Sequence, residues 1–316
     1  MSERTYSRRG VLRGVGAATT AAVVSSGLAS ADDGWTAAKS PVDIDLYDVQ
    51  STTDGVYAVG GDGTAVERNA GGWQKTFDGG PTGNSSDLNG AGVTDDGERL
   101  WIVGRSGAIG EYDVTTGDLI DHSSPNDVTN NFNSVAVAGR AGEANVYVAG
   151  DSGKIYYSLE NGKAGAWDEV TPASGSNINA LDFYDDRKGH AVDGNKTVLQ
   201  TDDGGTWDKL GIEDADYNFY GVDSDGTDDV WVSGGGGSVY RWNGSEWRRE
   251  NLGDADLRDV EVEGGDGLTV GAGGSIFELS DGRWRRMETP TDSNLRGVLL
   301  DSTSVAVGDA GTIVEV

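Results

Sequence analysis

The apolar and polar residues of this chain follow a pattern that repeats about every 40 residues. Each repeat opens with an apolar residue, a polar residue and a small residue before the next apolar position, as in Leu46-Tyr47-Asp48-Val49. An apolar run that ends in Val-Gly or a close relative follows, then a short glycine loop, a second apolar run and, in most repeats, a Trp. Short apolar runs between glycine turns predict β-strands.

The glycine that ends the first long apolar run marks seven repeats. It recurs at spacings of 44, 46, 44, 40, 37 and 37 residues, at Gly60, Gly104, Gly150, Gly194, Gly234, Gly271 and Gly308. A second glycine follows three residues later in every repeat except the fourth, which has Asn195-Lys196 in its loop. We expect these loops to join antiparallel strands, with glycine supplying the positive φ of a tight turn.

A period of this length with about four short strands is typical of a propeller blade. The sequence therefore predicts an all-β protein, a seven-bladed β-propeller over residues 32–316. The seventh repeat ends at Val316 without a Trp run, whereas Trp35 precedes the first repeat. We expect the N-terminal strand of the mature chain, with Trp35, to close the ring as the outer strand of the last blade. The second repeat has Thr115-Thr116-Gly117-Asp118 in place of the Trp and is expected to form a divergent blade.

Residues 1–31 do not share the repeat pattern. They contain the twin-arginine sequence Ser7-Arg8-Arg9-Gly10-Val11-Leu12-Arg13, a weakly apolar stretch over 14–28, and Ala29-Ser30-Ala31 as a cleavage site. An apolar stretch of this length is shorter than the roughly 20 residues that span a bilayer. These features predict a twin-arginine (Tat) signal peptide and export of the folded protein. The mature chain, from Asp32, is expected to be secreted or held at the cell surface without a membrane span.

The net charge of the chain limits the classes of molecule that it is expected to bind. It has 53 Asp and Glu against 24 Lys and Arg, a net charge of -29, and only seven of the basic residues are Lys. Such a surface repels phosphate backbones and anionic membranes, so we expect no nucleic-acid partner. Around molar salt the Debye length falls to about 3 Å and self-repulsion is screened. The composition therefore resembles that of halophilic archaeal proteins, although an ordinary acidic secreted protein remains the alternative.

Metal and cofactor chemistry finds little support in the composition. The chain has no Cys, which excludes disulfides, thiol catalysis and Cys-ligated metals, and its only histidines are His122 and His190. The stretch Asp223-Ser224-Asp225-Gly226-Thr227-Asp228-Asp229 is rich in oxygen ligands but lacks the bidentate Glu that completes a calcium loop. We expect a solvated turn there, and we expect neither a metal nor a cofactor in the protein.

Two motifs carry a resemblance to known proteins. Thr201-Asp202-Asp203-Gly204-Gly205-Thr206-Trp207 resembles the Asp-box, or BNR, turn of sialidase-like propellers: Asp202, Gly204, Thr206 and Trp207 match, while Gln200 stands where a Ser is usual. The Val-Gly-x-x-Gly-x-Ile strands and Leu-x-x-Val openings make the whole mature chain similar to the photosystem II stability and assembly factors. That resemblance implies an exported seven-bladed propeller that binds proteins. A salt-adapted archaeal source has no photosystem II, so the resemblance implies a binding scaffold but does not identify its partner.

The central opening of a propeller is where its ligands bind, and the innermost strands of the blades begin there. Seven equivalent positions, each directly after the opening apolar residue of a repeat, are polar or aromatic: Tyr47, Asn89, Asn133, Asn179, Tyr220, Arg258 and Arg296. Tyr and Arg are enriched at interface hot spots, so we expect this ring to bind a ligand or partner. The alternative is that inner strands become polar simply where they meet water.

These observations predict a non-enzymatic, exported binding or assembly scaffold, a monomer that engages a protein or surface glycan through its central opening. The alternative is a secreted sialidase-like glycoside hydrolase or lyase, with Tyr47 or Tyr220 as the nucleophile. A sialidase needs three converging arginines, but only two of the seven positions carry Arg. A glycosidase also needs two carboxyl groups about 5 to 9 Å apart, and no carboxylate pair recurs at a fixed spacing. We therefore expect no catalytic residues.

Overall fold

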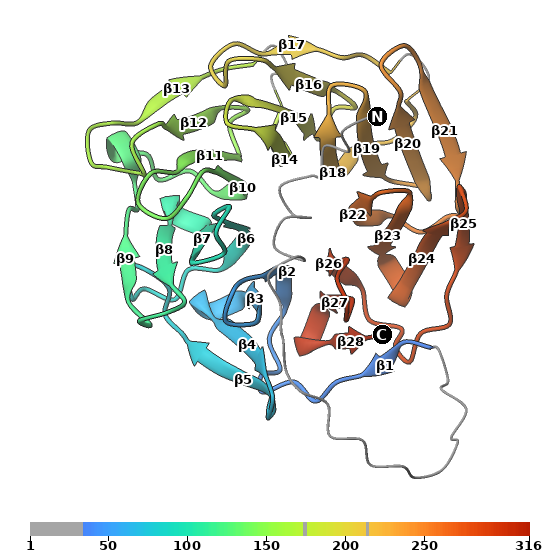
Figure 1. The fold of residues 1–316 in the computed structure, drawn as a ribbon, viewed down its shortest axis with the longest axis horizontal. Coiled ribbons are helices and arrows are strands. Elements are labelled where there is room, and N and C mark those ends of the chain that lie inside the picture. The colour runs from blue at the N-terminus through green and yellow to red at the C-terminus, as the bar shows by residue number, and fades with distance from the viewer. Residues whose placement is uncertain (1–33, 173–175, 213–214) are drawn as a thin grey trace, which may run out of the picture.

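The computed structural model describes residues 34–172, 176–212 and 215–316. Within these residues, seven four-stranded antiparallel sheets are arranged in a ring around a central opening (Figure 1). This confirms the predicted all-β, seven-bladed propeller. The predicted signal peptide, residues 1–31, lies outside the described residues. Among the residues that are described, no helix is long and apolar enough to cross a membrane.

Every blade runs from an inner strand at the central opening to an outer strand at the rim (Figure 1). Blades 1 and 2 contain β2 (Leu46–Ser51), β3 (Val56–Gly60), β4 (Ala65–Asn69), β5 (Gly72–Phe77), β6 (Leu88–Val93), β7 (Arg99–Gly104), β8 (Ile109–Asp113) and β9 (Leu119–Asp121). Blades 3 and 4 contain β10 (Phe132–Ala138), β11 (Asn145–Gly150), β12 (Ile155–Ser158), β13 (Asp168–Val170), β14 (Ile178–Asp185), β15 (Lys188–Asp193), β16 (Val198–Thr201) and β17 (Asp208–Lys209).

The remaining blades follow the same order of strands. Blades 5 and 6 contain β18 (Phe219–Gly226), β19 (Asp229–Gly234), β20 (Ser238–Trp242), β21 (Trp247–Asn251), β22 (Leu257–Glu263), β23 (Asp266–Gly271), β24 (Ser275–Ser280) and β25 (Arg283–Arg286). Blade 7 contains β26 (Leu295–Leu299), β27 (Val305–Gly308), β28 (Ile313–Glu315) and β1 (Thr36–Ala37). Short 3₁₀ turns occur at η1 (Gly61–Gly63), η2 (Arg105–Gly107), η3 (Pro125–Asp127), η4 (Ala272–Gly274) and η5 (Asp309–Gly311).

The ring is closed by its first strand. The two residues of β1 pair antiparallel with β28, so that Thr36 lies opposite Glu315. Trp35, the residue before β1, is 6% exposed and packs against apolar residues of blades 6 and 7, among them Leu268 and Val314. The predicted closure is confirmed. The second blade, expected to diverge, still has four strands, and β9 is its outer strand.

The strand-ending glycines and the loop glycines are needed for different reasons. The second loop glycines have φ between +65° and +73°, which confirms the predicted positive φ. The strand-ending Gly60 instead has an extended φ of -169°. A Cβ on Gly60 would lie 2.1 Å from the carbonyl oxygen of Asp45. In the fourth blade Gly194 has no such close neighbour, and Lys196 occupies the loop with a φ of 64°.

The core of the protein lies between neighbouring blades. Each apolar cluster combines residues of two adjacent sheets, as where Trp101 and Ile109 of blade 2 pack with Phe132 and Tyr156 of blade 3. Each face of a blade is therefore covered by the next blade. Because the apolar face of a single sheet has no stability in water, each blade depends on its neighbours, and the complete ring leaves no blade uncovered.

The turn that resembles an Asp-box is held by a different aspartate from the one that matches the motif. The carboxylate of Asp203, and not the pattern-matched Asp202, accepts hydrogen bonds from the backbone N–H groups of Gly205 and Thr206, at 2.9 and 2.6 Å. These bonds hold the pKa of Asp203 below its ordinary value. Trp207 is 7% exposed and packs edge-on against Phe183. The turn lies between β16 and the rim strand β17, away from the central opening.

Candidate functional site at the central channel

The seven predicted residues come together in the structure. Each occupies the second position of an innermost strand, and all seven line one hollow at the start of the central channel. We call them the ring residues: Tyr47, Asn89, Asn133, Asn179, Tyr220, Arg258 and Arg296. The repeat explains this convergence, because equivalent positions of seven equivalent strands meet at the axis of the ring.

The three asparagines of the ring hold neighbouring blades together. Their amide groups donate to carbonyl oxygens of the next blade: Asn89 to Phe132 at 2.8 Å, Asn133 to Ile178 at 3.1 Å, and Asn179 to Phe219 at 2.6 Å. Each accepting carbonyl belongs to the residue that precedes the next member of the ring. The amides are therefore engaged in structural hydrogen bonds, a role that the sequence did not reveal.

The tyrosines and arginines of the ring form two stacked pairs across blade boundaries. The guanidinium of Arg258 lies 4.2 Å from the ring centroid of Tyr220, and that of Arg296 lies 5.2 Å from the centroid of Tyr47. A cation over an aromatic face is attracted by the ring quadrupole. Arg258 also pairs with Asp256 at 3.1 Å. Both arginine side chains remain more than one third exposed, so they can still be reached from the solvent.

Tyr47 does not have the surroundings of a nucleophile. Burial, followed by the nearby carboxylates of Asp87 and Asp45, raises the pKa of Tyr47, which disfavours its phenolate. The closest inner-strand carboxylates are used for structure: Asp48 accepts from the backbone N–H of Ala91 at 2.8 Å. Asp259 similarly accepts from the backbone N–H of Val298 in blade 7, at 2.9 Å. These contacts argue against the hydrolase alternative.

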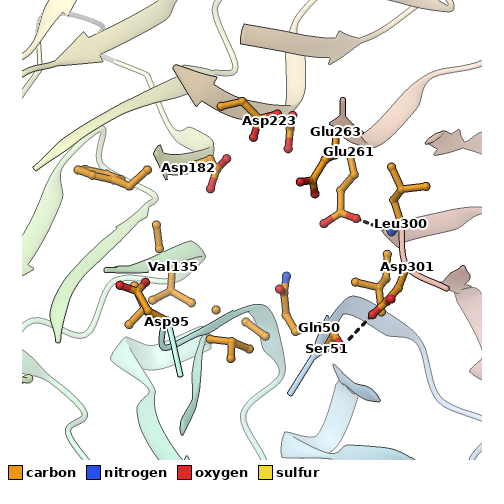
Figure 2. Close-up of a pocket in the computed structure, with 18 of the residues that line it drawn as sticks. Gln50, Ser51, Asp95, Val135, Asp182, Asp223, Glu261, Glu263, Leu300 and Asp301 are labelled. Atoms are coloured by element: carbon orange, nitrogen blue, oxygen red, sulfur yellow. Dashed lines mark hydrogen bonds between the residues drawn. The ribbon is translucent and has the colours of Figure 1, made fainter. Parts of the chain in front are cut away.

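The opposite mouth of the channel is strongly acidic. A hollow of about 930 Å³, including its open entrance, lies where the inner strands end. Among the described residues its walls carry Gln50, Ser51, Thr94 and seven carboxylates but no Lys or Arg. The carboxylates are Asp95, Asp182, Asp223, Asp225, Glu261, Glu263 and Asp301. Its apolar lining includes Val135, Val137, Val262 and Leu299. Figure 2 labels six of these carboxylates, all except Asp225, around the open centre. We call this hollow the acidic mouth.

The deepest carboxylates of the acidic mouth also join blades. Glu261 accepts from the backbone N–H of Leu300, and Asp182 accepts from that of Ser224 at 2.9 Å. Asp223, which is 3% exposed, accepts from the backbone N–H of Val262 at 3.3 Å. Farther out, Asp95, Asp225, Glu263 and Asp301 are only half-buried. The acidic mouth therefore has a structural floor and a more accessible outer rim of negative charge.

Residues 75–201 match the family model of the photosynthesis system II assembly factor YCF48. Similar solved structures include YCF48 bound to D1 peptide, 15% identical with a TM-score of 0.72, covering 89% of this chain and 94% of that one. The virginiamycin B lyase from Staphylococcus aureus is 14% identical with a TM-score of 0.75, covering 89% and 98%. The WD40 propeller domain of Doa1 is 12% identical with a TM-score of 0.72, covering 89% and 96%. No curated protein matches the sequence.

Identities this low establish a shared propeller fold and nothing further about activity. The YCF48 family match ends at Thr201 in blade 4. Several carboxylates of the acidic mouth, including Asp223, Glu261 and Asp301, lie beyond it. The family match therefore covers only part of the acidic mouth, since Asp95 and Asp182 lie within it.

The sequence carried one signal for the acidic mouth. Four residues after the opening apolar residue of blades 4, 5 and 6 stand Asp182, Asp223 and Glu261. An acid at the same position in three successive repeats indicates a shared surface, but it is obscured in a chain where acids occur everywhere. The stretch over 223–229, expected to be a solvated turn, instead forms the end of β18, a hairpin turn and the start of β19, and its Asp223 and Ser224 are each only 3% exposed. No group of three metal-ligating side chains gathers anywhere in the described ranges.

Proposed function

We propose that this protein is an exported, non-enzymatic scaffold that holds a segment of another protein at its central channel. The observation that carries the proposal is the acidic mouth, where seven carboxylates from several blades converge beside an apolar lining. The fold shared with YCF48, which has been solved with a D1 peptide, supports a peptide-like ligand. Export rests on the twin-arginine sequence of residues 1–31.

The chemistry of the acidic mouth defines the partner segment. A Lys or Arg side chain would complement the negative charge of the outer rim, and the apolar part of that side chain or of its neighbour would cover Val135 and Leu299. The propeller is preorganised, so binding would cost little ordering entropy. The ring residues at the other mouth form a second candidate contact, in which the exposed faces of Arg258 and Arg296 would meet a carboxylate or a surface glycan.

The test compares three variants in pull-downs from cell-surface extract at native salt. Asp225→Asn with Glu263→Gln neutralises the outer rim of the acidic mouth. Arg258→Ala with Arg296→Ala removes the ring cations. A matched control, Asp168→Asn with Asp208→Asn, removes two exposed carboxylates from the outer strands β13 and β17.

We expect the acidic-mouth variant to lose a bound protein that both the wild type and the control retain. If the acidic-mouth variant retains a partner that the ring variant loses, the binding site lies at the ring residues instead. A captured glycan in place of a protein would overturn the protein partner. Retention of every partner by both channel variants would refute a binding role for the channel.

A further inference from the structure

Arginine is concentrated at one place on the rim of this acidic protein. The outer strands of blades 5 and 6, β21 and β25, together hold five arginines and a single carboxylate, Glu250, in a chain where acids outnumber bases more than twofold. The arginines are exposed: Arg248, Arg249, Arg283, Arg285 and Arg286. The two strands follow one another along the rim (Figure 1). We call this surface the arginine edge.

The packing of the two blades shows which arginines share a seam. Trp284 of β25 packs edge-on against Trp231 of blade 5, with ring centroids 5.9 Å apart. Side chains alternate along a strand, so Arg286 lies on the same face as Trp284. In blade 5 the guanidinium of Arg241 lies 5.0 Å from the ring of Trp231, on the face turned toward blade 6. The arginine edge therefore continues into the boundary between blades 5 and 6.

Two arginines of blade 5 share one face of the sheet near its outer edge. In the register of β20 and β21, Arg241 lies directly opposite Arg248. Like charges opposite each other destabilise a sheet. Their carboxylate partners are weak surface pairs, Asp229 at 3.5 Å and Glu246 at 3.3 Å, and the Arg248 side chain is 74% exposed. A carboxylate placed between the two guanidinium groups would turn this repulsion into attraction.

Three arginines of β25 strengthen the same conclusion. Within the described part of the chain, Arg283, Arg285 and Arg286 make no ion pair. Charged residues on an edge strand also prevent unwanted strand pairing. The other rim strands, however, hold at most one basic residue each, such as Lys75 in β5 and Lys209 in β17. Edge protection is general, whereas the arginine cluster is confined to two neighbouring strands.

We propose that the arginine edge binds an extended acidic segment of a partner polypeptide, with carboxylates paired to Arg248 and Arg286 along the boundary between blades 5 and 6. Charge complementarity selects this occupant, because guanidinium groups pair bidentately with carboxylates. An extended segment also matches the outer strands, whose free edges lie at the rim. This surface is separate from the central channel, and a partner that is basic at one segment and acidic at another could engage both.

The test uses fluorescence anisotropy with a labelled peptide of about ten residues in which Glu alternates with Thr, so that every carboxylate lies on one face. The edge variant is Arg248→Gln with Arg286→Gln, which leaves Arg241 on Trp231. The matched control, Arg140→Gln with Arg187→Gln, removes the same charge from exposed positions in other parts of the ring. Circular dichroism confirms that each variant is folded before binding is measured.

We expect the edge variant to bind the acidic peptide at least about tenfold more weakly than the wild type and the control do. The variant Asp225→Asn with Glu263→Gln should bind it as the wild type does, which separates this proposal from the acidic mouth. Equal loss in the control, or no binding of the peptide by the wild type, would overturn the proposal. Binding to anionic vesicles alone, or self-association in the ultracentrifuge that only the edge variant loses, would assign the surface to a membrane or to a second copy instead.

Discussion

At five of the seven boundaries between blades the ring residues make the contact, and they do so in two different ways. At the boundaries that follow blades 2, 3 and 4, a neutral asparagine amide of the ring donates to the next backbone. At the boundaries between blades 5 and 6 and between blades 7 and 1, an arginine stacks on a tyrosine. Asp259 and Asp48 link the two that remain. One repeated position thus serves the same purpose through neutral hydrogen bonds in one half of the ring and through charge in the other.

The two halves meet at the boundary between blades 4 and 5, where the repeat itself is least regular. In the neutral half, Gly194 has no backbone carbonyl close to its missing Cβ, whereas in the charged half a Cβ on Gly271 would lie 2.0 Å from the carbonyl oxygen of Asp256. A feature that six blades require is therefore relaxed in the blade that ends the neutral half. The comparison teaches that the repeat constrains backbone contacts more strictly than side-chain chemistry.

The largest expected effect tests that backbone constraint. Gly271→Ala should lower the free energy of unfolding by about 3 kcal/mol or more, because the new methyl group would force a backbone carbonyl to move. Gly194→Ala, where the nearest atom is 3.7 Å away, should cost less than about 1 kcal/mol. Urea unfolding of both variants measures the difference. Equal losses would show that the fourth blade is not relaxed.

The next effect is a pH dependence specific to the neutral half. Burial lowers the pKa of His190 to about 4, and its Nδ1 lies 2.7 Å from the hydroxyl of Ser224. Above about pH 6.5 the imidazole of His190 is neutral in both the folded and the unfolded chain. Below that pH the unfolded chain binds a proton at His190, whereas the folded chain does not bind it until about pH 4. The free energy of unfolding should therefore fall by up to about 3 kcal/mol as the pH drops through this window.

This loss is measured by comparing urea unfolding of the wild type and of His190→Gln at several pH values. The carboxylates of the chain titrate in both proteins, so their contribution cancels in the comparison. The wild type should lose more stability than His190→Gln between about pH 6.5 and 4. Parallel curves for the two proteins would show that His190 accepts a proton in the folded state as readily as in the unfolded state.

The smallest effects separate the two kinds of seal directly. Asn179→Ala should cost about 1 to 2 kcal/mol, because the carbonyl of Phe219 loses its donor, and this cost should not depend on salt. Arg258→Ala should cost about 0.5 to 1 kcal/mol at low salt and less at high salt, since screening weakens its pairing.

Thermal melts from low salt to molar NaCl measure both variants beside the wild type. The wild type itself should melt at a higher temperature as salt rises, because screening relieves the self-repulsion of a chain with net charge -29. An unchanged melting temperature across this range would remove the argument for salt adaptation. A salt-dependent cost for Asn179→Ala would contradict the proposed difference between the two halves of the ring.

The fold could be predicted from the sequence because the repeat consists largely of residues that the backbone geometry requires. Strand-ending glycines, loop glycines and the unmatched Trp35 report close approaches and turns that only one architecture satisfies. The convergence of the seven ring residues followed from the same repeat. Their contacts did not, because whether an amide such as that of Asn133 meets a ligand or a neighbouring carbonyl depends on distances of a few ångströms between blades.

The acidic mouth could not be predicted from the sequence, for a different reason. Its members come from turns and strand ends of several blades, and an acid such as Glu261 looks in the sequence like any other acid of the surface. The choice of Asp203 over Asp202 in the turn before Trp207 has a similar cause, since two adjacent aspartates differ only in the direction of their side chains. Sequence reasoning thus performs best where glycine and tryptophan restrict the backbone, and worst where chemically identical side chains compete.

The pairing of β1 with β28 also has a consequence for the order in which this chain can be made and folded. Thr36 leaves the ribosome early, but its strand partner Glu315 follows 279 residues later. Until residues 313–315 have been made, blades 1 and 7 lack the contacts that cover their facing sheets. Non-local pairings of this kind form slowly. Ring closure is therefore a late step, which waits for the synthesis of residues 313–315.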